Sequence, residues 1–360
     1  MTLDREIPVV RASGSYYEVG RQIGEACSGA VGRAADLERA GVPRFGRSLD
    51  ELLGQAALCR RMTAETYPFV LEELDGAAAG AGVPAEALFA ASIEELWESR
   101  PSQNGRTEGR CTDVVVAPAA TANGHLLVAH NNDLPAASED DVVAIERDVP
   151  GDPLVFSIGI GPFISVGWNS AGLSLTGNEV SPNDERAGIP RLLLVRAQLR
   201  ARTLEEAVAA GVHPLQASAY NSVLAHSSGA AVNVEASATA YGRWGPSERG
   251  TIVHTNHYVS PEMVAYEGDL PYALRSSRRF NRAQQLLEDP RARPADEESL
   301  IRILSDHLNG DDAICRHTGA ADGVKTVFWC LADVTDRHVL FGRGNPCRSR
   351  PQSYRFDSAA

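Results

Sequence analysis

Cys111 stands at a place in the sequence where a thiol could do chemistry. It ends the polar, glycine-containing stretch 100–110 and begins the β-type run Val114–Ala117, in the order Glu-Gly-Arg-Cys-Thr-Asp-Val-Val-Val. The thiol is the nucleophilic side chain closest to ionising at neutral pH, so at such a junction it could attack a carbonyl carbon. The competing interpretation is an ordinary strand residue, because most cysteines outside disulfide frameworks are small buried hydrophobic residues.

The peptide carbonyl that precedes this thiol belongs to Arg110. Attack on it would exchange the peptide bond for a thioester, and water would then release Cys111 as a new N-terminus. The freed α-amine has a pKa of about 8 and would lie within reach of its own thiol. One residue would then supply both the nucleophile and the general base. The bond between Arg110 and Cys111 is therefore the predicted autoproteolytic site.

The elements that would position this cysteine change character at the same point. Before about Trp97, apolar residues at three- and four-residue steps predict helices. These helices are expected at 16–24, 49–67, 69–74 and from Pro84 towards Trp97, with a break at 77–84. After Cys111, short β-type runs occupy 114–117, 126–129, 142–145, 154–158 and 163–166, and a closing hairpin occupies 325–342. Helical segments are expected at 191–210, 274–288 and 297–308. This order predicts antiparallel sheets with helices on their outer faces.

Composition excludes several classes of function. The chain has 360 residues, 43% hydrophobic and 22% charged, which is typical of a globular protein, and its net charge of -13 argues against a nucleic-acid partner. Apolar runs such as 191–196 are too short to span a bilayer. The start of the chain has no positively charged segment followed by an apolar run, so a cytoplasmic location is the default prediction.

Neither the cysteines nor the histidines show the spacing of a metal site. The six cysteines include no CxxC pair and fit neither a disulfide framework nor a zinc knuckle. His254-x-x-His257 lacks the HExxH pattern, and its surroundings are β-like; His307 and His317 follow further on. The sequence therefore predicts no metal, and these histidines are interpreted as hydrogen-bonding residues of the sheet region.

Short motifs follow one another along nearly the whole chain. They are Gly14-x-x-x-Glu18-x-Gly20-x-x-x-Gly24, Cys111-Thr112, Asn131-Asn-Asp133, Asn169 to Asn178, Gly188-Ile-Pro190, Asn221 ahead of Glu235, His254-Thr-Asn-His257, Ser277 to Arg282, Ile314-Cys-Arg-His317 and Gly344-Asn-Pro-Cys347. In their order and spacing they resemble the self-processing family of isopenicillin-N acyltransferase (acyl-CoA:6-aminopenicillanic acid acyltransferase). The insect N-β-alanyl-dopamine hydrolases are similar, and the bile salt hydrolases and penicillin V acylases are more distantly similar.

This resemblance implies an α+β fold of the N-terminal nucleophile type, a four-layer αββα sandwich of two largely antiparallel sheets between helical layers. It implies a helical α chain, 1–110, and a β chain, 111–360, that stay associated as one folded body. No cofactor is implied. The substrate would be a small-molecule amide or acyl donor, with acyl-CoA as an alternative donor if transfer is the biological direction. Family members often carry glycine before the nucleophile; Arg110 stands there, with Gly109 one residue earlier, which predicts slower processing.

The resemblance also implies roles for single residues. Cys111 is the nucleophile, and Asp133 orients its freed α-amine. Asn221 donates to the oxyanion, and Arg279 stabilises the thiolate or binds a substrate carboxylate. The substrate-binding residues are His130, where bile salt hydrolases carry Arg, Asn131 and Asn178.

Each role has a structural alternative. Asp133 would be a turn residue, Asn221 would cap a strand end, and Arg279 would belong to a solvated basic face together with Arg275, Arg278 and Arg282. Two other functions also remain open: a processing-dead binding protein of the same fold, and an unprocessed cysteine hydrolase that pairs Cys111 with His254 or His257.

Overall fold

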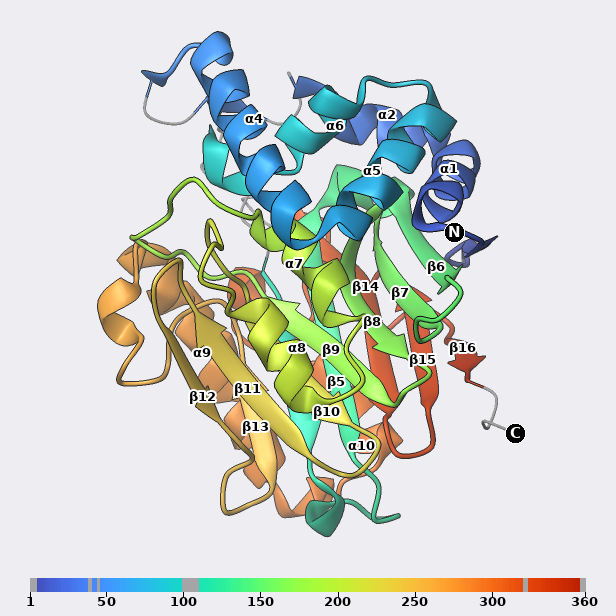
Figure 1. Cartoon of the computed structure of the whole chain (residues 1–360). Coiled ribbons are helices and arrows are strands. Elements are labelled where there is room, and N and C mark those ends of the chain that lie inside the picture. The colour runs from blue at the N-terminus through green and yellow to red at the C-terminus, as the bar shows by residue number, and fades with distance from the viewer. Residues whose placement is uncertain (1–4, 38–40, 44–45, 99–109, 320–322, 357–360) are drawn as a thin grey trace.

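Two stacked β-sheets form the centre of the molecule (Figure 1). The computed structural model describes residues 5–37, 41–43, 46–98, 110–319 and 323–356, so the predicted loop at 100–109, Gly109 included, lies outside the described residues. The larger sheet has eight strands in the order β1-β6-β7-β8-β9-β10-β11-β12. Their bounds are β1 Val9–Ser13, β6 Val142–Asp148, β7 Val155–Ile160, β8 Phe163–Asn169, β9 Leu173–Asn178, β10 Asn221–His226, β11 Ala231–Ala236 and β12 Tyr241–Trp244. All its neighbouring strands are antiparallel except β1 and β6.

The second sheet contains the inner strand that directly follows the predicted nucleophile. Its antiparallel order is β13-β4-β5-β14-β15-β16. The bounds are β13 Thr251–His254, β4 Thr112–Val116, β5 Leu127–Pro135, β14 Val324–Asp333, β15 His338–Arg343 and β16 Gln352–Arg355. Every residue of β4 and β14 is buried, because both faces of these strands are covered. A separate pair, β2 (Val42–Pro43) and β3 (Trp97–Glu98), links two loops of the helical region.

Alternation along the strands separates the inner core from the outer ones. Val115 and Val128 of the smaller sheet pack with Ala144, Phe156 and Ile158 of the larger one in a single apolar cluster between the sheets. The intervening residues of the same strands face outward, as the two-residue period of a strand requires. The central layer is therefore built from the β-type runs that the sequence analysis identified.

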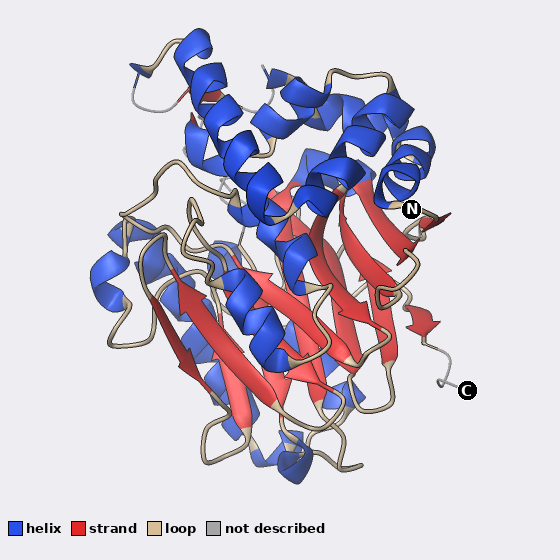
Figure 2. Ribbon diagram, viewed as in Figure 1, coloured by secondary structure: helices blue, strands red, loops and turns tan. Residues whose placement is uncertain are grey.

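Helices cover both outer faces, which completes the four layers (Figure 2). Helices α7 (Arg191–Gln198) and α8 (Leu204–Gly211) pack on the larger sheet. Helices α9 (Leu270–Glu288) and α10 (Glu297–Leu304) pack on the smaller one. The predicted αββα sandwich is confirmed. The segment predicted as one helix over 191–210 is two, because α8 restarts where the Thr203 hydroxyl accepts a hydrogen bond from the backbone N–H of Glu206.

The N-terminal helices lie over one end of the larger sheet (Figure 1). They are α1 Tyr16–Ala26, α2 Ser28–Ala34, α4 Leu49–Thr66, α5 Pro68–Ala81 and α6 Ala85–Ala91. The break expected at 77–84 was placed too early, because the alanines continue α5 to Ala81 and the chain turns only at Gly82, with φ 70°. None of the described helices combines the length and apolarity needed to cross a bilayer.

The first glycine motif is explained by helix packing. A Cβ atom at Gly20 would lie 1.9 Å from the backbone oxygen of Glu73, and one at Gly24 would lie 2.1 Å from that of Ala77. Helices α1 and α5 therefore approach each other through backbone, which only glycine permits. Ser15 and Glu18 form a capping box that begins α1.

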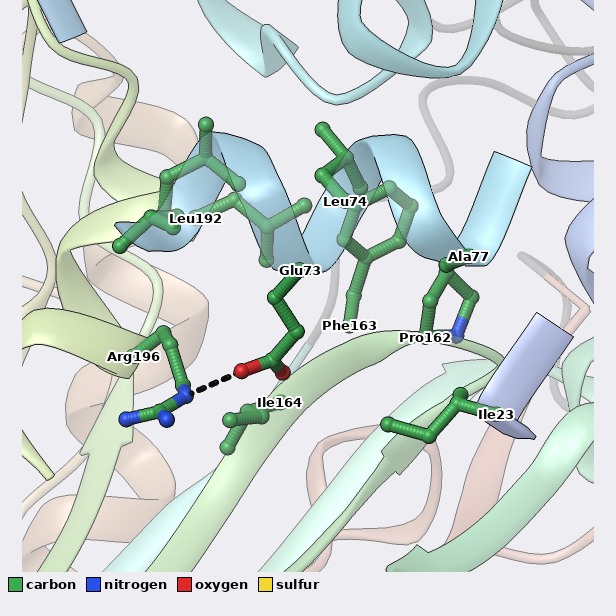
Figure 3. A pocket seen from close by; sticks show the side chains of 11 residues that line it. Ile23, Glu73, Leu74, Ala77, Pro162, Phe163, Ile164, Leu192 and Arg196 are labelled. Atoms are coloured by element: carbon green, nitrogen blue, oxygen red, sulfur yellow. Dashed lines mark hydrogen bonds and ion pairs between the residues drawn. The ribbon is translucent and has the colours of Figure 1, made fainter. Parts of the chain in front are cut away.

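A buried ion cluster joins the helical region to the rest of the fold. Glu73 of α5 accepts hydrogen bonds from Arg147 of β6 at 2.7 Å and from Arg196 of α7 at 2.8 Å. Figure 3 shows the Glu73 side chain reaching from α5 to Arg196. Burial opposes ionisation of Glu73, but the two guanidinium groups lower its pKa, so the carboxylate is charged. These pairs connect residues on both sides of the predicted cut.

Candidate active site

Cys111 directly precedes β4 and lines a cavity of about 230 Å³. The cysteine is 6% exposed, and its backbone N–H donates to Asn256 Oδ1 at 2.8 Å. Because β4 pairs with β5 in a register that places Thr112 opposite Asn131 and Asp113 opposite His130, Cys111 is next to Asn132. Alternation then puts Cys111, Asp113, His130 and Asn132 on one face of the sheet.

The cavity has an apolar wall and a polar end. The apolar wall comes from both sheets and from α7: Leu134, Ile160, Phe163, Ile164, Leu175, Leu192 and Val195. At the polar end, Arg191 is paired with Glu94 and Glu179, each at 2.8 Å, and the Tyr220 hydroxyl donates to Glu94 at 2.5 Å. The shape suits a molecule with an apolar portion next to a group that can hydrogen-bond to carboxylates.

Arg279 reaches the nucleophile from the outer side of the sheet. The buried face of α9 consists of Tyr272, Ser276, Arg279, Ala283 and Leu287, at three- and four-residue steps. The Arg279 guanidinium donates to the Cys111 carbonyl at 2.5 Å and to Thr112 Oγ1 at 3.3 Å. It holds the backbone of the predicted nucleophile in place.

The neighbouring arginines of α9 have other partners. Arg275 and Arg278 pair with Asp312, and Arg282 pairs with Asp306. Of the four arginines of this helix, Arg279, the one matched to the family motif, is therefore the one that contacts Cys111.

His130 lies beside the Cys111 thiol inside the protein. Its Nδ1 is 2.9 Å from Asp113 Oδ1, and both side chains are fully buried. Burial opposes the charged imidazolium, but the charge and hydrogen bond of Asp113, with a further contribution from the Cys111 thiol, raise the pKa of His130 to about 10. At neutral pH the buried His130 ring is therefore positive, in an ion pair with Asp113. His130 does not line the cavity itself.

Asp133 is buried on the opposite face of β5. Its Oδ1 accepts a hydrogen bond from Thr326 Oγ1 at 2.7 Å, while Oδ2 has no partner in the structure. Burial raises the pKa of Asp133 to about 6, against the charges of Arg316 and Arg279, which lower it. Its backbone carbonyl accepts the N–H of Arg110 at 2.8 Å, which fixes the chain just before the predicted cut.

Asn178 and Asn221 meet at the far wall of the cavity. Asn221 Nδ2 donates to Asn178 Oδ1 at 3.2 Å and to Asn233 Oδ1 at 3.0 Å. His254 Nδ1 also lies 2.9 Å from Asn178 Oδ1, so this oxygen is held on two sides. Asn178 Nδ2 is buried without a partner. Of the two amides, that of Asn178 has a donor left for a ligand, and that of Asn221 is already engaged.

The remaining predicted residues lie elsewhere. Asn131 donates its amide to the backbone oxygens of Leu304 and Ile314, each at 2.9 Å, on the α10 side of the sheet. His254 is buried with its Nε2 2.8 Å from Glu235, and His257 contacts Ser276. These histidines take part in hydrogen bonds of the sheet region, as the sequence interpretation expected.

Comparison with known proteins identifies the family. The model of the acyl-coenzyme A:6-aminopenicillanic acid acyl-transferase family matches residues 120–348, more than half of the chain. The chain belongs to this family. The family resemblance seen in the sequence motifs is thereby confirmed. Membership in this family indicates an acyltransferase or amidohydrolase that acts on amides.

Solved structures with a similar fold include two variants of conjugated bile acid hydrolase from Clostridium perfringens and penicillin V acylase from Agrobacterium tumefaciens. Identities are 12%, 12% and 16%, with TM-scores of 0.43, 0.44 and 0.43. The matches cover 69%, 69% and 68% of this chain and 97%, 97% and 84% of those chains. None of the curated proteins compared with the chain matches it significantly.

Three residues of this acyl-transferase family member escaped the sequence analysis. Asn256 accepts hydrogen bonds through Oδ1 from the Cys111 N–H and from Arg279, both at 2.8 Å, and so links nucleophile and arginine. Asp113 holds His130, and Asn132, rather than Asn131, lines the cavity. Asp113 could have been predicted, because alternate residues of a strand share one face and Asp113 is two residues after Cys111. For Asn256, the only signal in the sequence was its position between His254 and His257.

Proposed function

We propose that the protein is an autoproteolytically activated N-terminal cysteine amidohydrolase or acyltransferase for the amide bond of a small N-acyl or aminoacyl substrate. The observation that supports this most is the setting of Cys111 in the cavity wall. Its thiol lies beside the positive His130, and its backbone is held by Arg279 and Asn256. Such fixed placement is what a nucleophile needs for near-attack geometry.

Activation begins with attack of the Cys111 sulfur on the Arg110 carbonyl carbon. A C–S bond forms, the C–N bond breaks, and the nitrogen takes the proton that the thiol gives up. Water then hydrolyses the thioester, which leaves a carboxylate on Arg110 and a free thiol and amine on Cys111. Asn256 Oδ1 already accepts the Cys111 N–H and would accept from the freed amine. The buried pairs of Glu73 keep residues 1–110 attached to 111–360.

Turnover uses the same atoms. The Cys111 sulfur attacks the substrate carbonyl, and the α-amine of Cys111 takes the thiol proton and passes it to the leaving amine. The free Nδ2 of Asn178 donates to the oxyanion as negative charge develops. Asp133 orients the α-amine across the strand. Water or a second amine then releases the acyl group from sulfur, which gives hydrolysis or transfer.

The cavity supports a choice of substrate class. Its apolar wall fits the apolar portion of an acyl group, and the Glu94 and Glu179 end fits a portion that donates hydrogen bonds. A small amide with these two parts is the proposed substrate. An acyl-CoA thioester is an alternative donor if transfer is the biological direction, because a thioester acylates the same sulfur.

A panel of N-acyl and aminoacyl amides, analysed by mass spectrometry after acid quench, tests this proposal. We expect an acyl adduct on the peptide that carries Cys111 and release of the corresponding amine. Cys111→Ala should abolish both, and Cys27→Ser, at a cysteine that does not line the cavity, should change neither. Turnover of these amides with an adduct on a different residue, or undiminished in Cys111→Ala, would overturn the assignment.

The His130 geometry also favours a second candidate, a cysteine hydrolase that is never cut. Cys111, His130 and Asp113 lie in the order nucleophile, imidazole and carboxylate that such enzymes use. His254 and His257, the partners considered from the sequence, are bound elsewhere. This candidate predicts an intact active chain that loses turnover in His130→Gln.

A further inference from the structure

Two cysteines and two histidines converge outside the candidate active site. His307 follows α10, Cys315 and His317 precede β14, and Cys347 follows β15. One ligand atom from each lies within 4.8 Å of all the others. The cluster, defined as His307, Cys315, His317 and Cys347, brings together three separate segments of the chain. Cys315 is buried and Cys347 is exposed, so the cluster sits at the surface with one side covered.

Four of the six distances between ligand atoms are close to the edges of a tetrahedron around zinc. Zinc binds cysteine sulfur at about 2.3 Å and histidine nitrogen at about 2.0–2.1 Å, so its tetrahedral edges are about 3.8 Å for S–S, about 3.5 Å for S–N and about 3.3 Å for N–N. The observed S–S distance between Cys315 and Cys347 is 3.7 Å. The Sγ atoms of Cys315 and Cys347 lie 3.8 and 3.4 Å from His317 Nε2. The two Nε2 atoms, of His307 and His317, are 2.9 Å apart.

We propose that this cluster is a structural zinc site. Two thiolates and two imidazoles satisfy the four positions of Zn²⁺ and leave no open position for water or substrate. Thiolate ligands select zinc over magnesium or calcium, which prefer oxygen. A closed site of this kind stabilises the fold and does no chemistry.

Hydrogen bonds hold the three segments of the cluster together. The Cys315 N–H donates to the Asp306 carbonyl at 2.9 Å, next to His307. Asn345 Nδ2 donates to the Arg316 carbonyl at 2.5 Å and lies 3.4 Å from Cys315 Sγ, which ties the Cys347 segment to the Cys315 segment. These hydrogen bonds fix the chain segments that carry the ligands relative to one another.

The zinc site would fix a segment that borders the active site. Arg316 lies between the ligands Cys315 and His317, is buried, and its charge acts on Asp133. The Arg316 N–H donates to Thr326 Oγ1 at 3.0 Å, and the same hydroxyl donates to Asp133 at 2.7 Å. Metal binding would therefore position the carboxylate that faces the α-amine in the proposed mechanism.

The sequence predicted no metal because the ligand spacing is not that of a knuckle. The four residues occupy 307, 315, 317 and 347, and only the packing of β14 and β15 brings the last one to the others. The same four residues suggest one competing state, a disulfide between Cys315 and Cys347, whose sulfurs are 3.7 Å apart. The disulfide would consume both thiolates and exclude zinc.

Metal analysis of the untagged protein, purified under reducing conditions and supplied with zinc, tests the proposal without any assay of activity. We expect about one zinc ion per chain and a melting temperature that falls when a strong chelator removes the metal. Replacement by Co²⁺ should give the intense visible absorption of tetrahedral cobalt and a thiolate-to-cobalt band in the near ultraviolet. This spectrum requires no variant.

Variants then assign the ligands. Cys347→Ser and His317→Gln should each lower the retained zinc at least tenfold in competition with a chromogenic chelator, because each removes one ligand of four. Cys27→Ser, at a cysteine outside the cluster, should retain it. Absence of bound zinc and of the cobalt spectrum in reduced protein, equal zinc in Cys347→Ser, or a Cys315–Cys347 disulfide in freshly isolated protein would each overturn the proposal.

Discussion

The free amide of Asn178 leads to the sharpest prediction about the reaction. In Asn178→Asp the Oδ1 acceptor for Asn221 and His254 remains, and the buried Nδ2 donor, which has no hydrogen-bond partner, is lost. Loss of a single oxyanion donor typically slows acylation about 10²–10³-fold, or about 2.7–4 kcal/mol of transition-state stabilisation. The added negative charge acts in the same direction, so we expect the upper part of this range.

The assay compares two reactions of the same thiol. Acylation of Cys111 by p-nitrophenyl esters passes through an oxyanion, and its rate is read from the nitrophenolate burst. Alkylation by iodoacetamide needs the thiolate but forms no oxyanion. We expect Asn178→Asp to slow the burst about 10²-fold or more relative to alkylation. A burst that slows less than about threefold, or an equal loss in both reactions, would refute the reasoning, because it would place the effect on the thiol itself.

Further predictions concern the groups around the nucleophile and the helical region. Arg279→Ala should slow the ester burst about 10²-fold by freeing the backbone of the nucleophile. Burial lowers the pKa of His130, and Asp113 raises it to about 10. In Asp113→Asn we therefore expect the alkaline transition in the pH profile of the alkylation rate to shift to a pH below 10. A transition at the same pH as in the wild type would contradict this. Glu73→Gln should reduce the free energy of unfolding in urea by about 3–5 kcal/mol, since two buried arginines lose their counter-charge. The exposed Glu72→Gln should cost less than about 0.5 kcal/mol.

The β-type runs and the helical periodicity of the sequence predicted most of the strands and helices of the fold. The hairpin predicted over 325–342 is β14 and β15, and its turn falls between Asp333 and His338. The ends of the helices were predicted less well. Alanine-rich 77–81 was interpreted as a break because glycine and proline follow it, yet alanine is the best helix former and α5 continues to Ala81. The split between α7 and α8 depends on the Thr203 cap.

The residues of the candidate site could be predicted where a family motif pointed to a single position in the sequence. Arg279 was chosen among four arginines of one helix, and the structure places that residue, on the buried face of α9, at Cys111. Asn256 was not found, because its role depends on β13 lying next to β4. Asn131 was chosen over Asn132, although adjacent residues of a strand face opposite sides and only the register with β4 decides between them.

The central claim is that the chain cuts itself before Cys111 and then works through that residue. Intact mass spectrometry with N-terminal sequencing of freshly purified protein tests it most directly. The account predicts two associated fragments, one ending at Arg110 and one beginning at Cys111, and a single full-length chain in Cys111→Ala. A wild-type chain that stays full length over days while it turns over amides would contradict the account.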